Sequence, residues 1–232
     1  MITAVAIGRP GQLSLGDQAQ FWEGMPLYYH TRDWHDIDRE AAGLREKLEY
    51  RAQRRNVAVI LALEQYPDTE HLMMIDSFYL SQPGIGRLVK RYRQLADACL
   101  GPVVWGRMRV NLSQVLHSPI RFYDGWATPE LRWCPYGWRP DKDMLTSQAE
   151  LPLKGLYRVS SIAGCYLFPR SIWDKGARYE VPEDLHGCEQ NGFHESHRLK
   201  KYVDFSVEFW RTKRYGLVHC ARISLGNWLR TR

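Results

Sequence analysis

Apolar and polar positions alternate along the chain in short blocks, and these blocks predict strands separated by helices. The run Met1–Ile7 is rich in β-branched residues and leads into Gly8–Gly11, so it predicts a strand that ends in a loop. A second apolar run, His71–Asp76, predicts a buried strand that stops at an acidic residue. Val103–Trp105 predicts another short strand.

Helical spacing recurs between these runs. Apolar residues at steps of four, three and four predict a helix that begins at about Asp36, through Ile37, Ala41, Leu44 and Leu48. This helix either continues or kinks through Arg54–Asn56 into the apolar run Val57–Leu63, and Pro67 ends it. A second apolar stripe predicts a shorter helix over Ile85, Leu88, Val89, Tyr92 and Leu95.

The remaining chain predicts fewer regular elements. Residues 12–35 are expected to be irregular, and Gly101-Pro102 is expected to be a break. Val159–Phe168 predicts a strand pair or a strand and turn, Glu189–Lys201 a helix, and Gly216–Ile223 a late strand. Strands that alternate with helices predict an α/β fold with a mainly parallel central sheet flanked by helices.

Composition favours a single soluble domain. The chain has 232 residues, of which 44% are hydrophobic and 25% charged, as is ordinary for globular proteins. No apolar run approaches the roughly 20 residues that span a bilayer, and no signal peptide is recognisable, so we expect a cytoplasmic protein. The formal net charge of +6 leans weakly toward an anionic partner. The five cysteines form no CxxC pair and are expected to be reduced thiols.

The segment Arg54–Tyr79 is the most informative for chemistry. A basic pair and Asn56 head an apolar helix, which leads into a buried strand that delivers Asp76 at its carboxyl end. Ligands bind outside the carboxyl ends of strands in open α/β sheets, so Asp76 is placed to hold a divalent metal and a diphosphate, with Arg54 or Arg55 on the same phosphates. The alternative is that Asp76 caps a turn and the arginines are surface charges.

These residues resemble the nucleotide-sugar-binding half of GT-A-type glycosyltransferases, in particular the fungal mannan-polymerase type of mannosyltransferase and its small bacterial and phage relatives. Arg55-Asn56 match an "RN" at the start of a helix, and Met74–Asp76 match the strand that ends in the family's DxD, with Pro83 following. Other blocks resemble the family in the same order, over roughly residues 50–220: Val159–Phe168, Lys175–Ala177, Glu189–Phe193 and Leu217–His219.

The resemblance implies a single GT-A-like domain over residues 1–232, with a nucleotide-sugar-binding half (1–110) and an acceptor-binding half (111–232). We place an acceptor-facing region in residues 111–155, which are rich in Trp, Pro and Gly. The implied reaction moves a sugar from a nucleoside diphosphate sugar, such as a UDP- or GDP-sugar, to an acceptor hydroxyl, with Mn²⁺ or Mg²⁺. The implied donor-binding residues are Arg55, Asn56, Asp76, Ser77 and Gly164; the metal ligands are Asp76 and His219; and the catalytic residues are Glu189 and Asp76.

The chain departs from the family pattern at two acids. The DxD position reads Asp76-Ser77-Phe78, so either Asp76 and His219 hold a metal together with waters and the diphosphate, or no metal is needed. Asn191 replaces the second acid of the family's "ExEGF" block, which leaves Glu189 to orient the acceptor hydroxyl or to face the anomeric carbon. The alternative for Glu189 is complementation of the helix dipole. Nearby acids that could replace Glu189 are Glu183 and Asp184.

The histidines near the end of the chain also have explanations that involve no metal. His194 and His197 lack the spacing of a HExxH zinc motif, and their basic neighbours predict a solvated helix face. A lone histidine such as His219 in an apolar strand is by default a satisfied core residue, and only its place after the other blocks makes it a metal ligand.

Two other function classes compete with the transferase. Basic segments with interleaved tyrosines allow a non-catalytic nucleic-acid-binding protein, at Arg87–Arg93, Arg198–Lys201 and Arg211–Arg214. For a transferase, the same basic surface would suit a polyanionic acceptor such as modified phage DNA, in place of a glycan. A nucleotidyltransferase needs at least two clustered carboxylates, and Asp76-Ser77-Phe78 does not supply them.

Overall fold

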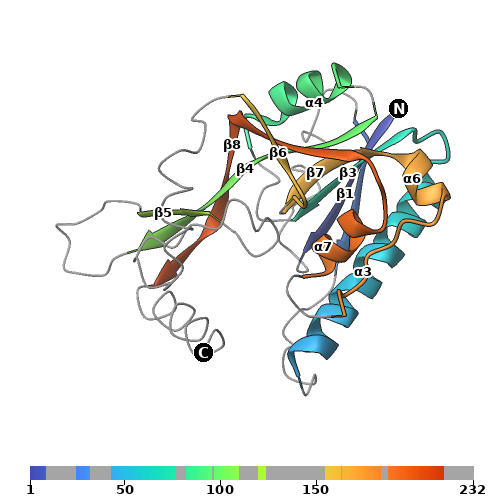
Figure 1. Cartoon of the computed structure of the whole chain (residues 1–232), viewed down its shortest axis with the longest axis horizontal. Helices are drawn as coiled ribbons and strands as arrows, with labels where there is room; N and C mark the ends of the chain where they lie inside the picture. Colours follow the sequence, from blue (N-terminus) through green and yellow to red (C-terminus); the bar gives the residue numbers. More distant parts are fainter. Residues whose placement is uncertain are drawn as a thin grey trace.

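A mixed β-sheet forms the centre of the protein in the computed structural model, which describes residues 1–8, 25–31, 43–76, 82–95, 97–109, 120–123, 155–162, 164–183 and 188–216 (Figure 1). The strands lie in the order β2-β1-β3-β7-β4-β8-β6, and β5 pairs with β4. Their bounds are β1 Ile2–Gly8, β2 Leu27–Thr31, β3 His71–Asp76, β4 Ala98–Arg109, β5 Ile120–Tyr123, β6 Leu156–Val159, β7 Cys165–Pro169 and β8 Lys200–Gly216.

The α/β class is confirmed, but the prediction of a mainly parallel sheet is wrong. Parallel pairs join β1 to β2, β1 to β3 and β4 to β8. Antiparallel pairs join β7 to both β3 and β4, and they also join β4 to β5 and β6 to β8. A fully buried strand such as β7 is apolar at every position whichever way its neighbours run, so its composition could not reveal its direction. Because β7 lies between β3 and β4, strands from the two halves of the chain interleave.

Four helices are described: α3 Leu44–Gln65, α4 Ile85–Arg93, α6 Arg170–Asp174 and α7 Glu189–Glu195. The long helix α3 packs against β1, β2 and α7, whereas α4 packs against β4 and β8. In Figure 1, strands β1, β3 and β7 pass between α4 and the pair α3 and α7. Helix α3 runs unbroken through Arg54–Asn56 and ends before Pro67, which disfavours helical geometry at Tyr66. The expected helical positions Ile37 and Ala41 lie outside the described residues.

Strand β4 passes through Gly101-Pro102, so the predicted break there is wrong. A Cβ atom at Gly101 would lie 2.3 Å from Ile162 Cγ2 and 2.6 Å from the Cys165 carbonyl oxygen. The glycine therefore allows a neighbouring segment to approach the strand closely. The register between β4 and β8 shifts immediately after Pro102, where the missing N–H is tolerated as an irregularity.

The end of the chain also differs from the prediction. The helix predicted over Glu189–Lys201 ends at Glu195, and β8 begins at Lys200. Strand β8 shows an alternation that the sequence analysis missed, because Val203, Phe205, Val207 and Phe209 are buried and Ser206 and Glu208 are exposed. Residues from 217 onward, which hold most of the predicted late strand, lie outside the described residues. Leu27–Thr31, expected to be irregular, forms β2.

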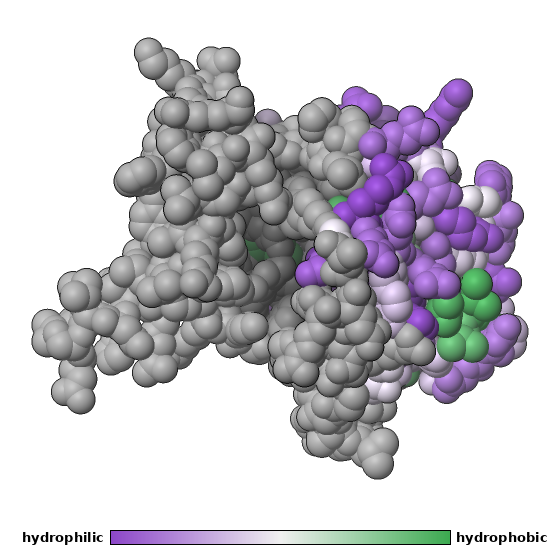
Figure 2. Space-filling view, turned by 90° about the horizontal axis from the view of Figure 1, so that it is seen from below, coloured by the Kyte–Doolittle hydropathy of each residue, from purple (hydrophilic) through white to green (hydrophobic). Residues whose placement is uncertain are grey.

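The described surface in Figure 2 is mainly hydrophilic, with one small hydrophobic area. Met1 and Ile60 are the large hydrophobic side chains that are exposed among the described residues. No described helix combines the length and apolar character that a bilayer crossing requires.

Candidate active site

A buried arginine joins two carboxylates that are far apart in the sequence. Arg55 Nη2 donates a hydrogen bond of 2.8 Å to Asp76 Oδ1, and Arg55 Nε donates one of 3.0 Å to Glu189 Oε1. The side chains of Arg55 and Glu189 are 7% and 4% exposed, whereas that of Asp76 is 19% exposed. The structure thus brings together three of the residues that the sequence analysis singled out. We call Arg55, Asp76 and Glu189 the Arg–carboxylate triad.

Helix α3 places Arg55 inside because Arg55 occupies a position in its buried stripe. The stripe has steps of four, three, four and three, which keep its members on one helical face: Leu48, Ala52, Arg55, Val59 and Ala62. A buried guanidinium needs compensating charge, and the two carboxylates supply it. The neighbouring Arg54 instead stacks over Tyr50, with 4.7 Å between the guanidinium carbon and the ring centre.

Asp76 is the last residue of β3, after four buried apolar residues. Its backbone N–H donates to the carbonyl of Gly164 at 2.8 Å, and the Gly164 N–H donates to Gln190 Oε1 at 3.2 Å. Gly164 has a φ of 63°, which a glycine adopts readily. Gly164 therefore links the end of β3 to α7, and both of its backbone polar groups are engaged.

Glu189 begins α7, and close packing fixes the position of this helix. A Cβ atom at Gly192 would lie 2.0 Å from the Glu180 carbonyl oxygen, so α7 rests directly on that backbone. Asn191 Oδ1 accepts a hydrogen bond from the Cys188 N–H at 2.9 Å and closes a capping box. Asn191 thus caps the helix at the position where the resemblance expects an acid.

Asn56 faces the protein backbone. Its Nδ2 donates to the Tyr179 carbonyl at 3.0 Å, and its Oδ1 accepts from the Tyr179 N–H at 2.9 Å. Tyr179 also packs against the triad, with Arg55 5.7 Å from its ring centre, and its hydroxyl accepts a hydrogen bond of 2.6 Å from Tyr166. Both ends of the Asn56 amide are engaged, so this residue pins the chain beside the triad.

The charges of the triad sum to minus one when all three groups are ionised. Burial alone would lower the pKa of Arg55, but the charges of Asp76 and Glu189 raise it well above its ordinary value. Among the described residues, Arg55 Nη1 and Glu189 Oε2 are buried and meet no hydrogen-bond partner. A buried donor and a buried acceptor without partners indicate that a ligand or a water belongs beside the triad.

Several predicted site residues cannot be placed. Ser77, His219 and the alternative acid Asp184 lie outside the described residues, as does most of the predicted acceptor-facing region 111–155. Glu183 is described, and its carbonyl accepts a hydrogen bond from Arg45 Nη1 at 3.5 Å.

The sequence analysis missed a cluster of side chains at the end of α7. His194 is fully buried and His197 is half-buried, so the predicted solvated face is wrong for these two residues. One ring nitrogen of each histidine lies within 4.8 Å of the other and of Cys99 Sγ. Cys99 lies 95 positions before His194 in the sequence, so no local spacing motif could connect the two residues.

Three solved structures resemble the chain at low sequence identity. No protein-family description and no curated protein matches the chain. A197 from STIV aligns with a TM-score of 0.48 and 13% identity, over 92% of this chain and 86% of its own. A glycosyltransferase involved in the glycosylation of the major capsid of PBCV-1 aligns with a TM-score of 0.45 and 11% identity, over 97% of this chain and 98% of its own. An apo UDP-glucose pyrophosphorylase aligns with a TM-score of 0.31 and 12% identity, over 100% of this chain and 82% of its own. These three TM-scores lie below 0.5, so the function is argued from the residues of this chain.

Proposed function

We propose that the protein is a glycosyltransferase that moves a sugar from a nucleoside diphosphate sugar to an acceptor hydroxyl. The observation that carries the proposal is the Arg–carboxylate triad. In it the helical Arg55 binds a strand-end aspartate 21 residues later and a helix-start glutamate 134 residues later. Strand ends of α/β sheets are where ligands bind, and Asp76 is the triad member with the greatest exposure there.

The geometry changes the role expected for Arg55. Two of its nitrogens are committed to Asp76 and Glu189, and its side chain is 7% exposed. It therefore supplies little charge to a diphosphate in the solvent-facing part of the site. We infer that Arg55 holds the two carboxylates in place.

A divalent cation fits this arrangement. The triad leaves one excess negative charge, and the exposed part of Asp76 offers the hard carboxylate oxygen that Mn²⁺ and Mg²⁺ prefer. In this proposal Asp76 holds the cation, His219 remains a proposed second ligand, and Ser77 remains a proposed contact with the donor. When bound, such a cation would neutralise charge on the diphosphate leaving group.

We assign to Asp76 the contact with the donor, and to Glu189 the positioning of that contact through Arg55. The Glu189 side chain is less exposed than that of Asp76. Glu189 Oε1 accepts a hydrogen bond from the Arg55 guanidinium, which also binds Asp76. A direct role for Glu189 at the acceptor hydroxyl or the anomeric carbon stays a prediction. The two roles differ in kinetics: loss of a transition-state contact lowers kcat at constant KM, whereas loss of positioning also weakens donor binding and raises KM.

The acceptor is proposed to be either a polyanion, such as modified phage DNA, or a glycan. In favour of a polyanion, α4 carries four exposed basic residues and no acidic one, namely Arg87, Lys90, Arg91 and Arg93. The same residues would serve the alternative function of a non-catalytic nucleic-acid-binding protein. That alternative predicts DNA affinity that falls steeply with salt and does not change in an Asp76 variant.

The test is a donor-hydrolysis screen with UDP-, GDP- and dTDP-sugars, each with and without Mn²⁺. We expect hydrolysis of at least one donor, and we expect Asp76→Asn to reduce it by roughly 100-fold or more, as for loss of a single charge-stabilising group. Asp174→Asn is the matched control, because this aspartate is exposed on α6 and pairs with Arg170. Failure of every donor to bind at millimolar concentration, or equal activity of the two variants, would refute the proposal.

A further inference from the structure

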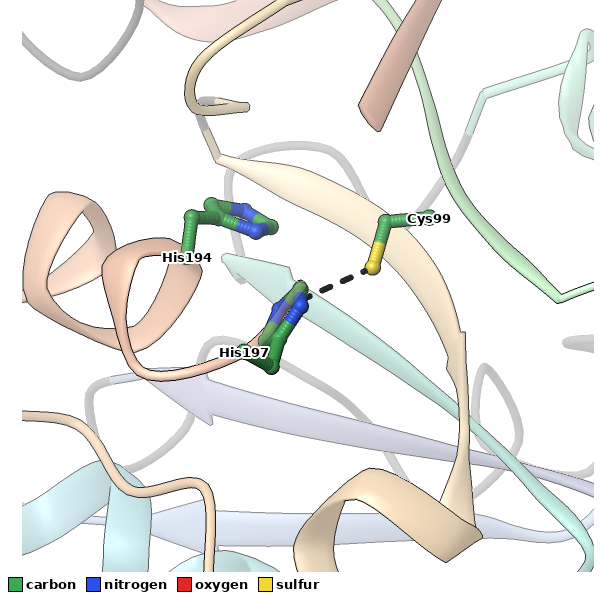
Figure 3. Close-up of side chains that lie close together, drawn as sticks. All are labelled: Cys99, His194 and His197. Carbon is green, nitrogen blue, oxygen red and sulfur yellow. Dashed lines mark hydrogen bonds between the residues drawn. The ribbon is translucent and has the colours of Figure 1, made fainter. Parts of the chain in front are cut away.

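A second cluster of chemically capable side chains lies at the far end of α7 from Glu189. Cys99 on β4 faces His194 on α7 and His197 just beyond that helix, as Figure 3 shows. One ligand atom from each residue lies within 4.8 Å of the other two, and Cys99 Sγ lies 3.9 Å from His197 Nε2. We call Cys99, His194 and His197 the Cys–His cluster.

The fold brings the cluster together through the pairing of β4 with β8. Cys99 pairs in register with Lys201, so the turn that joins α7 to β8 must pass beside Cys99. His197 lies in that turn, and the Lys201 ammonium donates to its carbonyl at 3.0 Å. His194 lies three residues earlier, which places it on the same side of the helix end.

The burial of the cluster calls for a partner. Cys99 and His194 are both 0% exposed. By strict geometry neither ring nitrogen of His194 meets a hydrogen-bond partner among the described residues, and the backbone of Ile162 offers a weak hydrogen bond to one of them at most. Burial lowers the pKa of His194 well below its ordinary value, the charges of His197 and Lys201 lower it further, and the Ile162 hydrogen bond raises it. At least one buried ring nitrogen therefore lacks a partner, which is costly, and a metal ion would engage its lone pair.

We propose that Cys99, His194 and His197 bind a thiophilic d¹⁰ metal ion, Zn²⁺ or Cu⁺. Thiolate and imidazole ligands together are typical of both ions, and hard cations such as Mg²⁺ avoid them. In tetrahedral zinc, bonds of about 2.3 Å to sulfur and about 2.0 Å to nitrogen separate those two atoms by about 3.5 Å. The observed separation between Cys99 Sγ and His197 Nε2 is 3.9 Å, so a small side-chain movement would let these two atoms share one ion, with the His194 ligand atom within 4.8 Å of both. A water would complete the four ligands of Zn²⁺.

The protons balance in a simple exchange. Burial raises the pKa of the Cys99 thiol to about 12, although the charge of Lys201 acts to lower it. The thiol is therefore protonated without metal, and binding breaks the S–H bond, forms the metal–sulfur bond and releases the proton to solvent. The histidines bind as neutral imidazoles and release no proton.

His197 changes its tautomer on binding. The Leu199 N–H donates to His197 Nδ1 at a long 3.3 Å, which leaves the ring proton on Nε2, the nitrogen nearest Cys99. A metal bound to Nε2 requires the proton on Nδ1, so the Leu199 hydrogen bond must give way. The tautomer of His197 therefore reports directly on metal binding at this site.

The experiment uses the whole chain, and Co²⁺ serves as the spectroscopic probe for the zinc site. We expect one equivalent of Co²⁺ to give a thiolate-to-cobalt charge-transfer band, and native mass spectrometry to find one tightly bound Zn²⁺ or, under anaerobic reducing conditions, one Cu⁺. Cys99→Ala is expected to lose the band and the bound ion. Cys165→Ala, which removes another buried free cysteine, is the matched control and should keep both. Nitrogen-resolved NMR should show the proton of His197 move from Nε2 to Nδ1 when metal is added.

Three results would overturn the proposal: no band and no bound ion in the natural sequence, equal metal binding by the Cys99 and Cys165 variants, or a His197 tautomer that ignores added metal. If Cys99→Ala fails to fold, His197→Gln changes a half-buried ligand instead. If His197→Gln keeps the circular dichroism spectrum of the natural sequence but loses metal binding, the site is lost while the fold remains. The two binding measurements on the natural sequence also distinguish zinc from copper.

Discussion

Replacement of Arg55 by methionine tests whether the Arg–carboxylate triad is a real buried ion cluster. Methionine has a similar length and can fill the space in α3, but it removes the guanidinium that joins Asp76 and Glu189. The two carboxylates would then remain, with Glu189 4% exposed and no cation between them. The expected effect is therefore far larger than the loss of one hydrogen bond.

The magnitude follows from the burial. Removal of one partner from a buried ion pair costs about 3–5 kcal/mol, because the remaining charge is left uncompensated in a poorly solvated place. That is a large part of the roughly 5–15 kcal/mol that stabilises a typical native domain. For a chain of this size each kcal/mol corresponds to roughly 2–4 °C, so Tm should fall by roughly 6–20 °C.

Urea unfolding at neutral pH measures the effect, and Arg45→Met on the same helix is the matched control. Arg45 pairs with Glu49 at 2.8 Å, but both side chains are about half exposed, at 51% and 55%. An exposed pair four residues apart is worth only about 0.3–0.5 kcal/mol. The comparison keeps helix, residue type and replacement constant, and sets a buried arginine between two carboxylates against an exposed arginine paired with one.

A second substitution decides whether the lost stability reflects unpaired charge. Glu189→Gln in the Arg55→Met background removes one of the stranded carboxylates, so the double variant should regain part of the lost free energy of unfolding. If Arg55→Met costs no more than Arg45→Met, or if Glu189→Gln adds its own full penalty on top, the charge argument is refuted.

Three further outcomes follow from contacts elsewhere in the fold. Gly192→Ala should destabilise the protein by about 1–3 kcal/mol in urea unfolding, because its Cβ would lie 2.0 Å from the Glu180 carbonyl oxygen; an unchanged midpoint would show that α7 is not seated there. Asn56→Ala should cost about 1–3 kcal/mol in the same assay, because the backbone N–H and carbonyl of Tyr179 both lose their partner, and an effect as small as that of an exposed substitution would contradict this. Burial lowers the pKa of His71 from its ordinary 6.5, so below about that pH the unfolded chain binds more protons than the folded chain, and the free energy of unfolding falls. His71→Gln should therefore make the free energy of unfolding depend less on pH between pH 7 and 5. An unaltered pH dependence would refute this.

Local pattern predicted several of the elements. β3 was predicted with its observed bounds, and the stripe that begins at Ile85 became α4. The pattern failed where the signal depends on partners. Gly101-Pro102 looks like a break because glycine and proline usually punctuate structure, but the close approach of Ile162 requires a glycine inside β4. The direction of β7 depends on which strands flank it, and no local pattern encodes that.

Several candidate residues make intramolecular contacts that the sequence analysis did not predict. Asn56 and Gly164 were predicted to bind the donor, which stays a prediction; in the structure Asn56 binds the backbone of Tyr179, and Gly164 connects Asp76 to Gln190. Arg55 was expected on phosphates and faces carboxylates. A sequence motif indicates which residues lie in one site. Which of them support the site from within is seen from their intramolecular hydrogen bonds, and these are not encoded in the motif.

Helix α7 connects the two clusters. It has seven residues, and a helix that short does not form by itself in water, so tertiary contacts must hold it. At its start Glu189 is bound by Arg55, in its middle Gly192 rests on Glu180, and at its end His194 faces Cys99. In the proposed function Glu189 positions Asp76, which requires a formed helix, so a metal bound at the Cys–His cluster would also stabilise the proposed active site. Amide hydrogen exchange over α7 should therefore slow when metal is added, and the same exchange should accelerate in Arg55→Met; exchange that responds to neither change would show that the helix is held by its middle alone.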